Sequence, residues 1–274
     1  MIRLFLIEWI KLRKYRAFYI LTGLYFIVVG FVCSGGTILL SYLKSKGASF
    51  KNIDPTMLPI YDFPDVWQNI TFVAARLKIF LAFIVIISLT NEITYKTLRQ
   101  NIIDGLSRVE FMISKISMIF VLALANTLLV FIIGLANGLA YSHEKSIGAI
   151  FGNMEFLGAF FLNVFGFLIF SFLIGLLIKR TGIAIVFLAI YGSFVEPIIT
   201  VIFTSVRELP QIFEKIAGFF PVKALRDLLP NTFSRYILQE IQDYIAFSNI
   251  AIVSCQVLIY TGFIYLLLKW RNNN

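Results

Sequence analysis

Charged residues are scarce in this chain of 274 residues. Asp, Glu, Lys and Arg make up only 14% of it, while hydrophobic residues make up 59% and the mean hydropathy is +0.87. A soluble domain normally carries about 25% charged residues. The scarcity therefore excludes an ordinary soluble domain and indicates that lipid is the solvent for most of the chain.

Residue types that support catalysis are also few. The chain has one histidine, His143, and two cysteines, Cys33 and Cys255, which both fall in apolar segments. A membrane-embedded hydrolase or transferase needs converging His, Asp or Glu side chains, or an activated Ser or Cys. The sequence contains no H-E-x-x-H motif, paired acids or nucleophile elbow. We therefore expect no enzyme activity, and no metal or cofactor on this chain.

Long apolar runs fill most of the sequence. A helix needs about 20 residues to cross a bilayer, and six runs reach that length. Because lipid offers no water to the backbone, such runs must be helical. We predict an all-α integral membrane protein with a single transmembrane domain, 1–274, and six transmembrane helices. The predicted spans are 17–41, 70–90, 116–140, 156–178, 183–204 and 248–268.

Lys and Arg are concentrated in alternate connecting segments. If the N-terminus is inside, the inner segments hold 13 Lys and Arg against 4 Asp and Glu, and the remainder holds 11 of each. Inner loops of membrane proteins carry such an excess, so both termini are predicted to be cytoplasmic. A nucleic-acid partner is not expected, because no soluble domain carries the basic residues. The inner segments are 1–16, 91–115, 179–182 and 269–274.

The N-terminal segment 2–16 has apolar and basic residues at helical spacing. This pattern predicts a short amphipathic helix on the inner membrane surface, in contact with lipid. A compatible alternative is a positively charged segment that only sets orientation. The apolar positions are Ile2, Phe5, Trp9 and Leu12, and the basic positions are Arg3, Lys11 and Lys14.

The loop 91–115 between the second and third spans contains helix start and stop signals. Residues 93–103 fit a short amphipathic helix, and Gly105 suits the left-handed residue that ends a helix. Ser107 followed by Glu110 fits an S-x-x-E capping box, which starts a new helix. We predict a short cytoplasmic helix held between two membrane helices. The alternative is a solvated loop that only holds positive charge inside.

This loop resembles that of the ABC-2 permease family, whose second and third spans are joined by a motif like E-x-x-x-G-T-x-R, then a Ser-Arg pair and a Lys. The chain departs from the motif at Lys96, where the family usually has glycine. The basic N-terminus, the six spans and the long last outer loop are also similar to that family. The matching residues are Glu92, Thr97, Arg99, Ser107, Arg108 and Lys115.

The resemblance implies the membrane subunit of an ATP-driven exporter in a bacterial-type cytoplasmic membrane. Segment 93–105 would then be the coupling helix that docks on a separate ATP-binding subunit. ATP and Mg would be held by that partner, because this chain has no G-x-x-x-x-G-K-[ST] phosphate loop. A second permease chain is implied, identical or different. The implied coupling residues are Glu92, Lys96, Thr97, Arg99, Ile102, Ile103, Gly105, Ser107 and Arg108.

The substrate and the direction of transport stay open, although the many aromatic residues suit a lipophilic or amphipathic cargo. An alternative function is ion-coupled secondary transport without ATP, whose folds often show repeated halves and broken helices. A membrane-embedded enzyme is the less favoured third reading.

The last outer loop, 205–247, is too apolar for a free loop and is divided by three prolines. Gln211–Phe220 and Val222–Leu229 each fit a short amphipathic helix. The resemblance implies re-entrant helices that dip into the outer leaflet. The alternative is a pair of interfacial helices with a packing role.

Charged residues inside the predicted spans are the remaining candidates. A carboxylate near a helix centre costs about 2.5–3.5 kcal/mol on insertion scales, so Glu196 needs a partner or a role. Lys78 and Arg76 of the second span lie at a similar depth. We predict that Glu196 pairs with one of them, as a packing contact or as a gate, and that Pro197 kinks the fifth span.

Overall fold

The structure is a computed structural model that describes residues 2–13, 16–47, 60–103, 105–205, 210–232 and 244–270. Every regular element within these residues is helical. The elements are α1 (Ile2–Arg13), α2 (Arg16–Ser34), α3 (Gly36–Ser45), α4 (Val66–Thr94), α5 (Thr97–Ile103), α6 (Arg108–Tyr141), α7 (Ile147–Phe151), α8 (Glu155–Ile178), α9 (Thr181–Ile190), the π-helix η2 (Tyr191–Val195), α10 (Glu196–Ser205), α11 (Gln211–Ala217), α12 (Pro221–Asp227) and α14 (Phe247–Trp270).

Five helical stretches within the described residues are long and apolar enough to cross a membrane. They contain the second to sixth predicted spans. A sixth apolar helix, Phe18–Ser34, is shorter. The five stretches are Val66–Thr94, Arg108–Tyr141, Ile147–Ile178, Thr181–Ser205 and Phe247–Trp270.

The first predicted span, 17–41, is not one continuous helix. Helix α2 ends at Ser34, and α3 begins after a turn at Gly35. The Tyr61 hydroxyl fills the break, since it donates to the Cys33 carbonyl at 2.7 Å and accepts from the Gly36 amide at 3.0 Å. A Cβ on Gly36 would lie 2.6 Å from that hydroxyl oxygen. Hydropathy alone does not predict the break, because it depends on hydrogen bonds from Tyr61, which is distant in the sequence.

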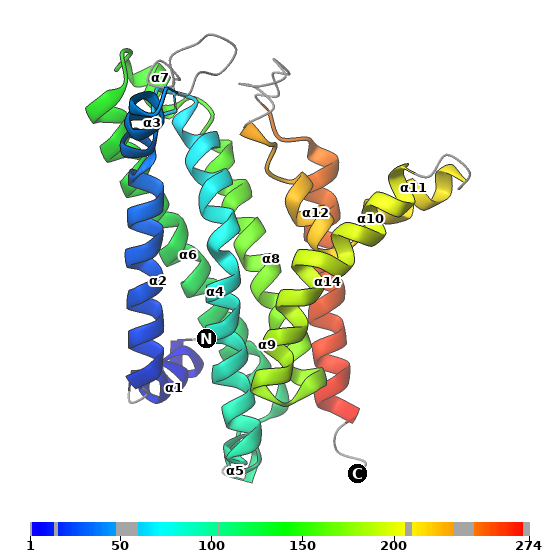
Figure 1. Cartoon of the computed structure of the whole chain (residues 1–274). Helices are drawn as coiled ribbons and strands as arrows, with labels where there is room; N and C mark the ends of the chain where they lie inside the picture. Colours follow the sequence, from blue (N-terminus) through cyan, green and yellow to red (C-terminus); the bar gives the residue numbers. More distant parts are fainter. Residues whose placement is uncertain are drawn as a thin grey trace.

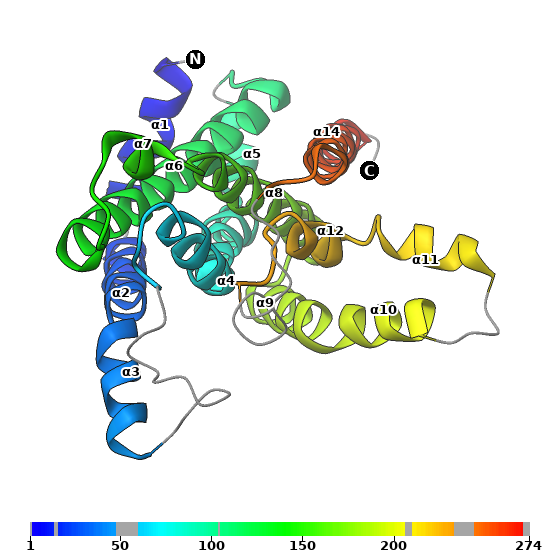
Figure 2. The same cartoon turned by 90° about the horizontal axis from the view of Figure 1, so that it is seen from above.

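Helix α8 lies at the centre of the bundle. It packs against α4, α6, α9, α12 and α14, and Figure 2 shows it among these helices. A helix that is hydrophobic on all sides is expected to be buried. The side chains of Phe160, Leu168, Ile169 and Phe172 accordingly have no exposed surface.

Two glycines of α6 contact aromatic rings, one from the start of α4 and one from the turn before it. A Cβ on Gly134 would lie 2.8 Å from the Trp67 ring, and one on Gly138 would overlap Phe63. Trp67 is fully buried, stacks on Phe131, and donates from its indole nitrogen to the Ile150 carbonyl at 2.8 Å. These contacts fix the spacing of α4 and α6.

The two ends of the bundle differ in charge. Helices α1 and α5 and the C-terminal end of α14 lie at one end, which we call the α5 end, and α3 and α7 lie at the other (Figure 1). The turn between α8 and α9, with Lys179 and Arg180, is also at the α5 end. The described parts of the segments that carry the excess of Lys and Arg are therefore gathered at a single end.

Candidate functional site

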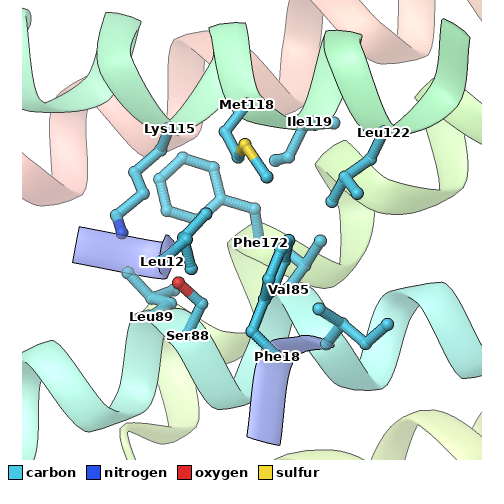
Figure 3. A pocket seen from close by; sticks show the side chains of 11 residues that line it. Leu12, Phe18, Val85, Ser88, Leu89, Lys115, Met118, Ile119, Leu122 and Phe172 are labelled. Atoms are coloured by element: carbon cyan, nitrogen blue, oxygen red, sulfur yellow. The ribbon is translucent and has the colours of Figure 1, made fainter. Parts of the chain in front are cut away.

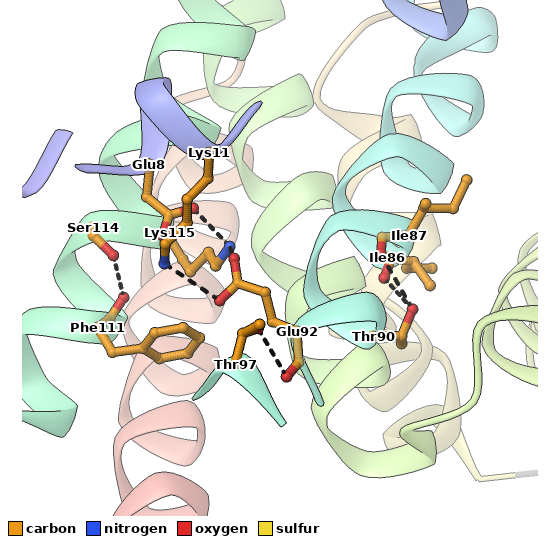
Figure 4. A network of polar contacts seen from close by, with 10 residues as sticks. All are labelled: Glu8, Lys11, Ile86, Ile87, Thr90, Glu92, Thr97, Phe111, Ser114 and Lys115. Atoms are coloured by element: carbon orange, nitrogen blue, oxygen red, sulfur yellow. Dashed lines mark hydrogen bonds and ion pairs between the residues drawn. The ribbon is translucent and has the colours of Figure 1, made fainter. Parts of the chain in front are cut away.

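A cluster of four charged side chains, two of them buried, lies at the α5 end. Lys115 of α6 bonds Glu8 of α1 at 2.6 Å and Glu92 of α4 at 2.5 Å. Lys11 bonds Glu8 at 3.1 Å and lies 3.7 Å from Glu92 (Figure 4). We call these four residues the Lys115 cluster. It joins three helices through alternating positive and negative charges.

The Lys115 cluster is electrically balanced, and its Glu8 and Lys115 side chains are buried while Lys11 is 30% exposed. The Glu8 side chain is 1% exposed and the Lys115 side chain 7% exposed. Burial alone would favour the neutral form of Glu8, but the Lys115 and Lys11 ammonium groups outweigh it and hold the pKa of Glu8 below its ordinary value of 4.5. A buried charge is tolerated only when it is paired in this way. Glu8 therefore stays ionised and docks α1 on the bundle.

Helix α1 is oriented by Glu8. Of the expected apolar positions, Leu12 is buried beside Glu8, while Trp9 is 38% exposed. Leu6 and Ile10 are exposed on the same side as Trp9. The buried ion pair decides the rotation of the helix, because Glu8 must reach Lys115. Lys14 and the side chains of Ile2, Arg3 and Phe5 lie outside the described part of the chain.

An apolar pocket adjoins the Lys115 cluster. Figure 3 shows it between α1, α2, α4, α6 and α8, with Leu12, Phe18, Val85 and Phe172 among its lining residues. Lys115 lies at its edge. Apart from Lys115 and Ser88, the residues that line the pocket are apolar.

The loop after α4 forms a short helix, but later than expected. Helix α4 continues to Thr94, so Ile93 belongs to it, and α5 begins at Thr97 after a turn. Lys96 makes the turn with a φ of +57°, in the left-handed region. The Thr97 hydroxyl donates to the Glu92 carbonyl at 3.2 Å. Lys96 stands where the ABC-2 permease motif usually has glycine, and glycine adopts a positive φ without strain.

The end of α5 and the start of α6 follow the sequence signals. Gly105 has a φ of +97°, as expected for a helix-ending glycine. Ser107 and Glu110 form the predicted capping box, with the Glu110 amide donating to Ser107 at 3.2 Å and the Ser107 amide donating to Glu110 at 2.8 Å. Arg108 donates to the Leu268 carbonyl, which ties this start to the end of α14.

The surface of α5 includes exposed apolar area. Ile103 is 68% exposed, and Tyr95 in the preceding turn is 75% exposed. Figure 1 shows α5 at the extremity of the bundle. The side chains of Arg99 and Ile102, and all of Asp104, lie outside the described part of the chain.

The predicted ion pair of Glu196 does not form, although all three of its candidate residues are described. Glu196 is 1% exposed and accepts a hydrogen bond from the Lys223 amide at 2.5 Å, in the first turn of α12. Lys78 donates to Asn163 at 2.5 Å, and the Arg76 guanidinium lies over the Phe72 ring at 4.6 Å. The first amides of a helix lack partners and carry partial positive charge, so they take the carboxylate instead.

Amide side chains of two spans hold the rest of the α11–α12 segment. Asn163 of α8 donates to the Leu225 carbonyl, and Asn249 of α14 donates to the Asp227 carbonyl at 2.7 Å. Gln256 donates to the Phe219 carbonyl at 2.8 Å. Sequence reasoning missed Asn249 and Gln256, whose signal is an amide inside an apolar run. Polar groups of α8, α10 and α14 thus fix α12 against the bundle.

The fifth predicted span bends at a π-helix. Residues Tyr191–Val195 form η2 directly before Glu196 and Pro197. Proline has no amide hydrogen to continue the α-helical ladder, and π-bulges accommodate such interruptions. Figure 1 shows α10 leaving the direction of α9 at this point, which brings Glu196 to α12.

Comparison with protein families agrees with this arrangement. A family model described as ABC-2 family transporter protein matches residues 68–271, from α4 to the end of α14. No curated protein matches the chain. The match covers well over half of the sequence, and the all-helical bundle with five membrane-spanning candidates is consistent with it. The chain therefore belongs to the ABC-2 family of transporter membrane proteins, the permeases of ABC transporters.

Proposed function

We propose that this chain is the membrane subunit of an ATP-driven exporter, and that a separate ATPase moves it through α5. The α5 end and both termini would be cytoplasmic, as the positive-inside rule favours. Helix α2 would be a sixth span, because its 19 residues extend about 28 Å at 1.5 Å per residue. ATP and Mg would be bound by the partner, and a second permease chain would complete the transporter.

The Lys115 cluster is the observation that carries this proposal. Helix α5 lies in the chain between Glu92, near the end of α4, and the capping box that starts α6. Lys115 bonds Glu92 and Glu8, so α4, α6 and α1 are joined directly above α5. Breaking one partner out of a buried pair costs about 3–5 kcal/mol. A force applied to α5 would therefore move three helices together.

The surface of α5 suits a docking role. Ile103 and Tyr95 are exposed at the tip of the bundle, where an ATPase groove would cover them. Leu6, Trp9 and Ile10 of α1 would lie in the inner leaflet, as the apolar face of an interfacial helix does. On the other side of the membrane, α11 and α12 would be re-entrant helices that cap the pathway of a lipophilic or amphipathic substrate.

The test is a mild-detergent pull-down of the tagged full chain from its native membrane, with mass spectrometry of the copurifying proteins. Ile103→Asp is compared with Ile147→Asp, since Ile147 is 77% exposed in α7 at the opposite end. We expect a phosphate-loop ATPase with the wild type and with Ile147→Asp, and its loss with Ile103→Asp and with a variant altered at Arg99, Ile102 and Ile103. If no ATPase copurifies under any mild condition, the proposal fails and ion-coupled transport becomes the better explanation.

A further inference from the structure

Helix α12 is too short to be stable by itself. It has seven residues, Pro221–Asp227. More than half of its backbone groups therefore belong to the first amides or the last carbonyls, which have no partner within an α-helix. Isolated helices of fewer than about 12 residues are marginal even in favourable sequences. The fold of α12 thus depends on groups that other helices bring to it.

Two amide side chains hold the last turn of α12. Asn163 of α8 donates to the Leu225 carbonyl, and Asn249 of α14 donates to the Asp227 carbonyl at 2.7 Å. The Leu225 carbonyl needs such a donor, because the amide four positions later in the chain bonds the Arg226 carbonyl instead. Asn163 and Asn249 are therefore the C-terminal caps of α12.

The Asn163 amide is used on both of its sides. Its oxygen accepts a hydrogen bond from Lys78 Nζ of α4 at 2.5 Å, while its nitrogen donates to Leu225. The Asn163 residue is only 1% exposed. A lysine ammonium has donors and no acceptor, so the amide oxygen must face α4. The amide nitrogen is then left to face the carbonyl of α12.

Three helices are close together around Asn163. The Lys78 ammonium also lies 5.0 Å from the Phe167 ring, one turn after Asn163 on α8. A Cβ on Gly166 would lie 3.3 Å from the Leu225 side chain, so α8 and α12 are closely packed here. Figure 2 shows α12 beside α8. Helix α4 thus reaches α12 across a single residue of α8.

We propose that Lys78 is a positioning residue for α12 and that it acts through Asn163. Lys78 makes no hydrogen bond to any described residue of α12. It fixes which side of the Asn163 amide faces α12, and this amide caps the last turn. A shift of α4 that withdraws Lys78 would leave the amide oxygen without its donor. The amide would then be free to turn away from Leu225, and α12 would lose a cap.

This contact connects α12 with the α5 end. On α4, Lys78 lies 14 residues before Glu92, which corresponds to about 21 Å at 1.5 Å per residue. Glu92 bonds Lys115 near α5, and Figure 1 shows α12 in the half of the bundle away from α5. The consequence for transport rests on the proposed function, in which an ATPase moves α5. A movement of α4 would then change how firmly α12 is held.

The test measures amide hydrogen exchange of residues 222–227 in the purified full chain in a neutral detergent. Lys78→Met removes the donor, Asn163→Ala removes the cap, and the double variant removes both. We expect Asn163→Ala to quicken exchange about tenfold and Lys78→Met to quicken it about threefold or more. The double variant should exchange no faster than Asn163→Ala, because Lys78 acts only through that amide.

Asn249→Ala is the matched control for this cycle. It removes the other amide cap of α12, which bonds Asp227 without a bond to Lys78. Lys78→Met should therefore add its full effect to that of Asn249→Ala. Asn137→Ala changes an amide of α6 that bonds the Ile133 carbonyl, and it should leave the exchange of α12 unchanged.

Two conservative variants test the roles of the individual groups. Lys78→Arg keeps a side chain with donors only, so the exchange of α12 should stay within about twofold of wild type. Asn163→Asp can still accept from Lys78 but cannot donate to Leu225, so it should quicken the exchange, and it replaces Asn163→Ala if that variant does not fold. Thermal unfolding verifies that each variant is folded. Unchanged exchange in Lys78→Met, or an equal effect of Lys78→Met with and without the Asn163 amide, would overturn the proposal.

The pull-down separates this inference from the exporter proposal. Lys78→Met should still copurify with the ATPase, since Lys78 is far from α5. If the ATPase copurifies but Lys78→Met leaves the exchange of α12 unchanged, only this inference fails. If the ATPase never copurifies while the cycle shows coupling, the exporter proposal fails and the action of Lys78 on α12 stands.

Discussion

Lys115 bonds Glu92 at 2.5 Å although the two residues lie on opposite sides of the helix-turn-helix loop that contains α5. The same ammonium bonds Glu8, more than one hundred positions earlier. A single buried cation therefore holds both ends of the loop and the N-terminal helix, and its removal has a predictable effect.

Replacing Lys115 with methionine should lower the free energy of unfolding by about 3 kcal/mol, because Glu8 and Glu92 lose their buried counter-ion and keep only the more exposed Lys11. The measurement is chemical denaturation in detergent. Lys145→Met, at an exposed loop lysine, should change stability by less than about 0.5 kcal/mol. Adding Glu8→Gln and Glu92→Gln to Lys115→Met should recover part of the loss, and no recovery would contradict the charge argument.

The contribution of Glu8 should depend on pH. The neighbouring lysines outweigh burial and depress its pKa in the folded chain, so its ion pairs add stability above the ordinary value of about 4.5 and lose it as pH falls through the folded value. The unfolding temperatures of the wild type and Glu8→Gln should thus differ at pH 7 and converge in acid. A gap that widens on acidification would show the opposite sign.

Lys96→Gly should stabilise the chain by about 0.5–1 kcal/mol, because Lys96 has a φ of +57° and glycine adopts that conformation without strain. Gln100→Gly, inside α5, is the matched change at an ordinary helical position and should cost about 1 kcal/mol. Thermal unfolding of the two variants compares them directly. Equal destabilisation by both would mean that the left-handed turn is absent.

Glu196→Ala should loosen α12 by removing its N-terminal cap. Loss of a cap costs about 1–2 kcal/mol, so amide hydrogen exchange of residues 222–227 should quicken roughly tenfold. Thr204→Ala, on α10 like Glu196, leaves the cap intact and should not alter the hydrogen exchange of α12. Glu196 does not contact Lys78, so adding Lys78→Glu to Glu196→Lys should not restore the stability that Glu196→Lys loses. Restored stability in the double variant would support the ion-pair hypothesis.

Much of the helical layout follows from hydropathy, because lipid forces every apolar run into a helix. The second to sixth predicted spans fall inside α4, α6, α8, Thr181–Ser205 and α14 for this reason. The break at Gly35 was not predictable, since it depends on the Tyr61 hydroxyl from another part of the chain. Local capping signals at Gly105 and Ser107 were read correctly because their partners are a few residues away.

The charged sites were predicted unevenly for a physical reason. The need of Glu196 for a partner follows from its residue type, but a backbone amide as that partner leaves no mark in the sequence. Glu8 was missed as a cluster member, and its signal was one acid within a basic N-terminal segment, three residues before Lys11. A charged residue in an apolar segment indicates that a partner is needed, but only the packed structure identifies that partner.

The π-helix η2 sets the direction of α10. A π-bulge is equivalent to one extra residue taken up in a wider helical turn, and such bulges kink helices, so deleting one of Tyr191–Val195 would remove the kink and redirect α10. Glu196 would then swing away from the α12 amides while the span kept nearly its full length. A homologue with one residue fewer in the segment that corresponds to Tyr191–Val195 would need a different residue to cap α12. The length of this segment therefore distinguishes homologues that cap α12 with the equivalent of Glu196 from those that do not.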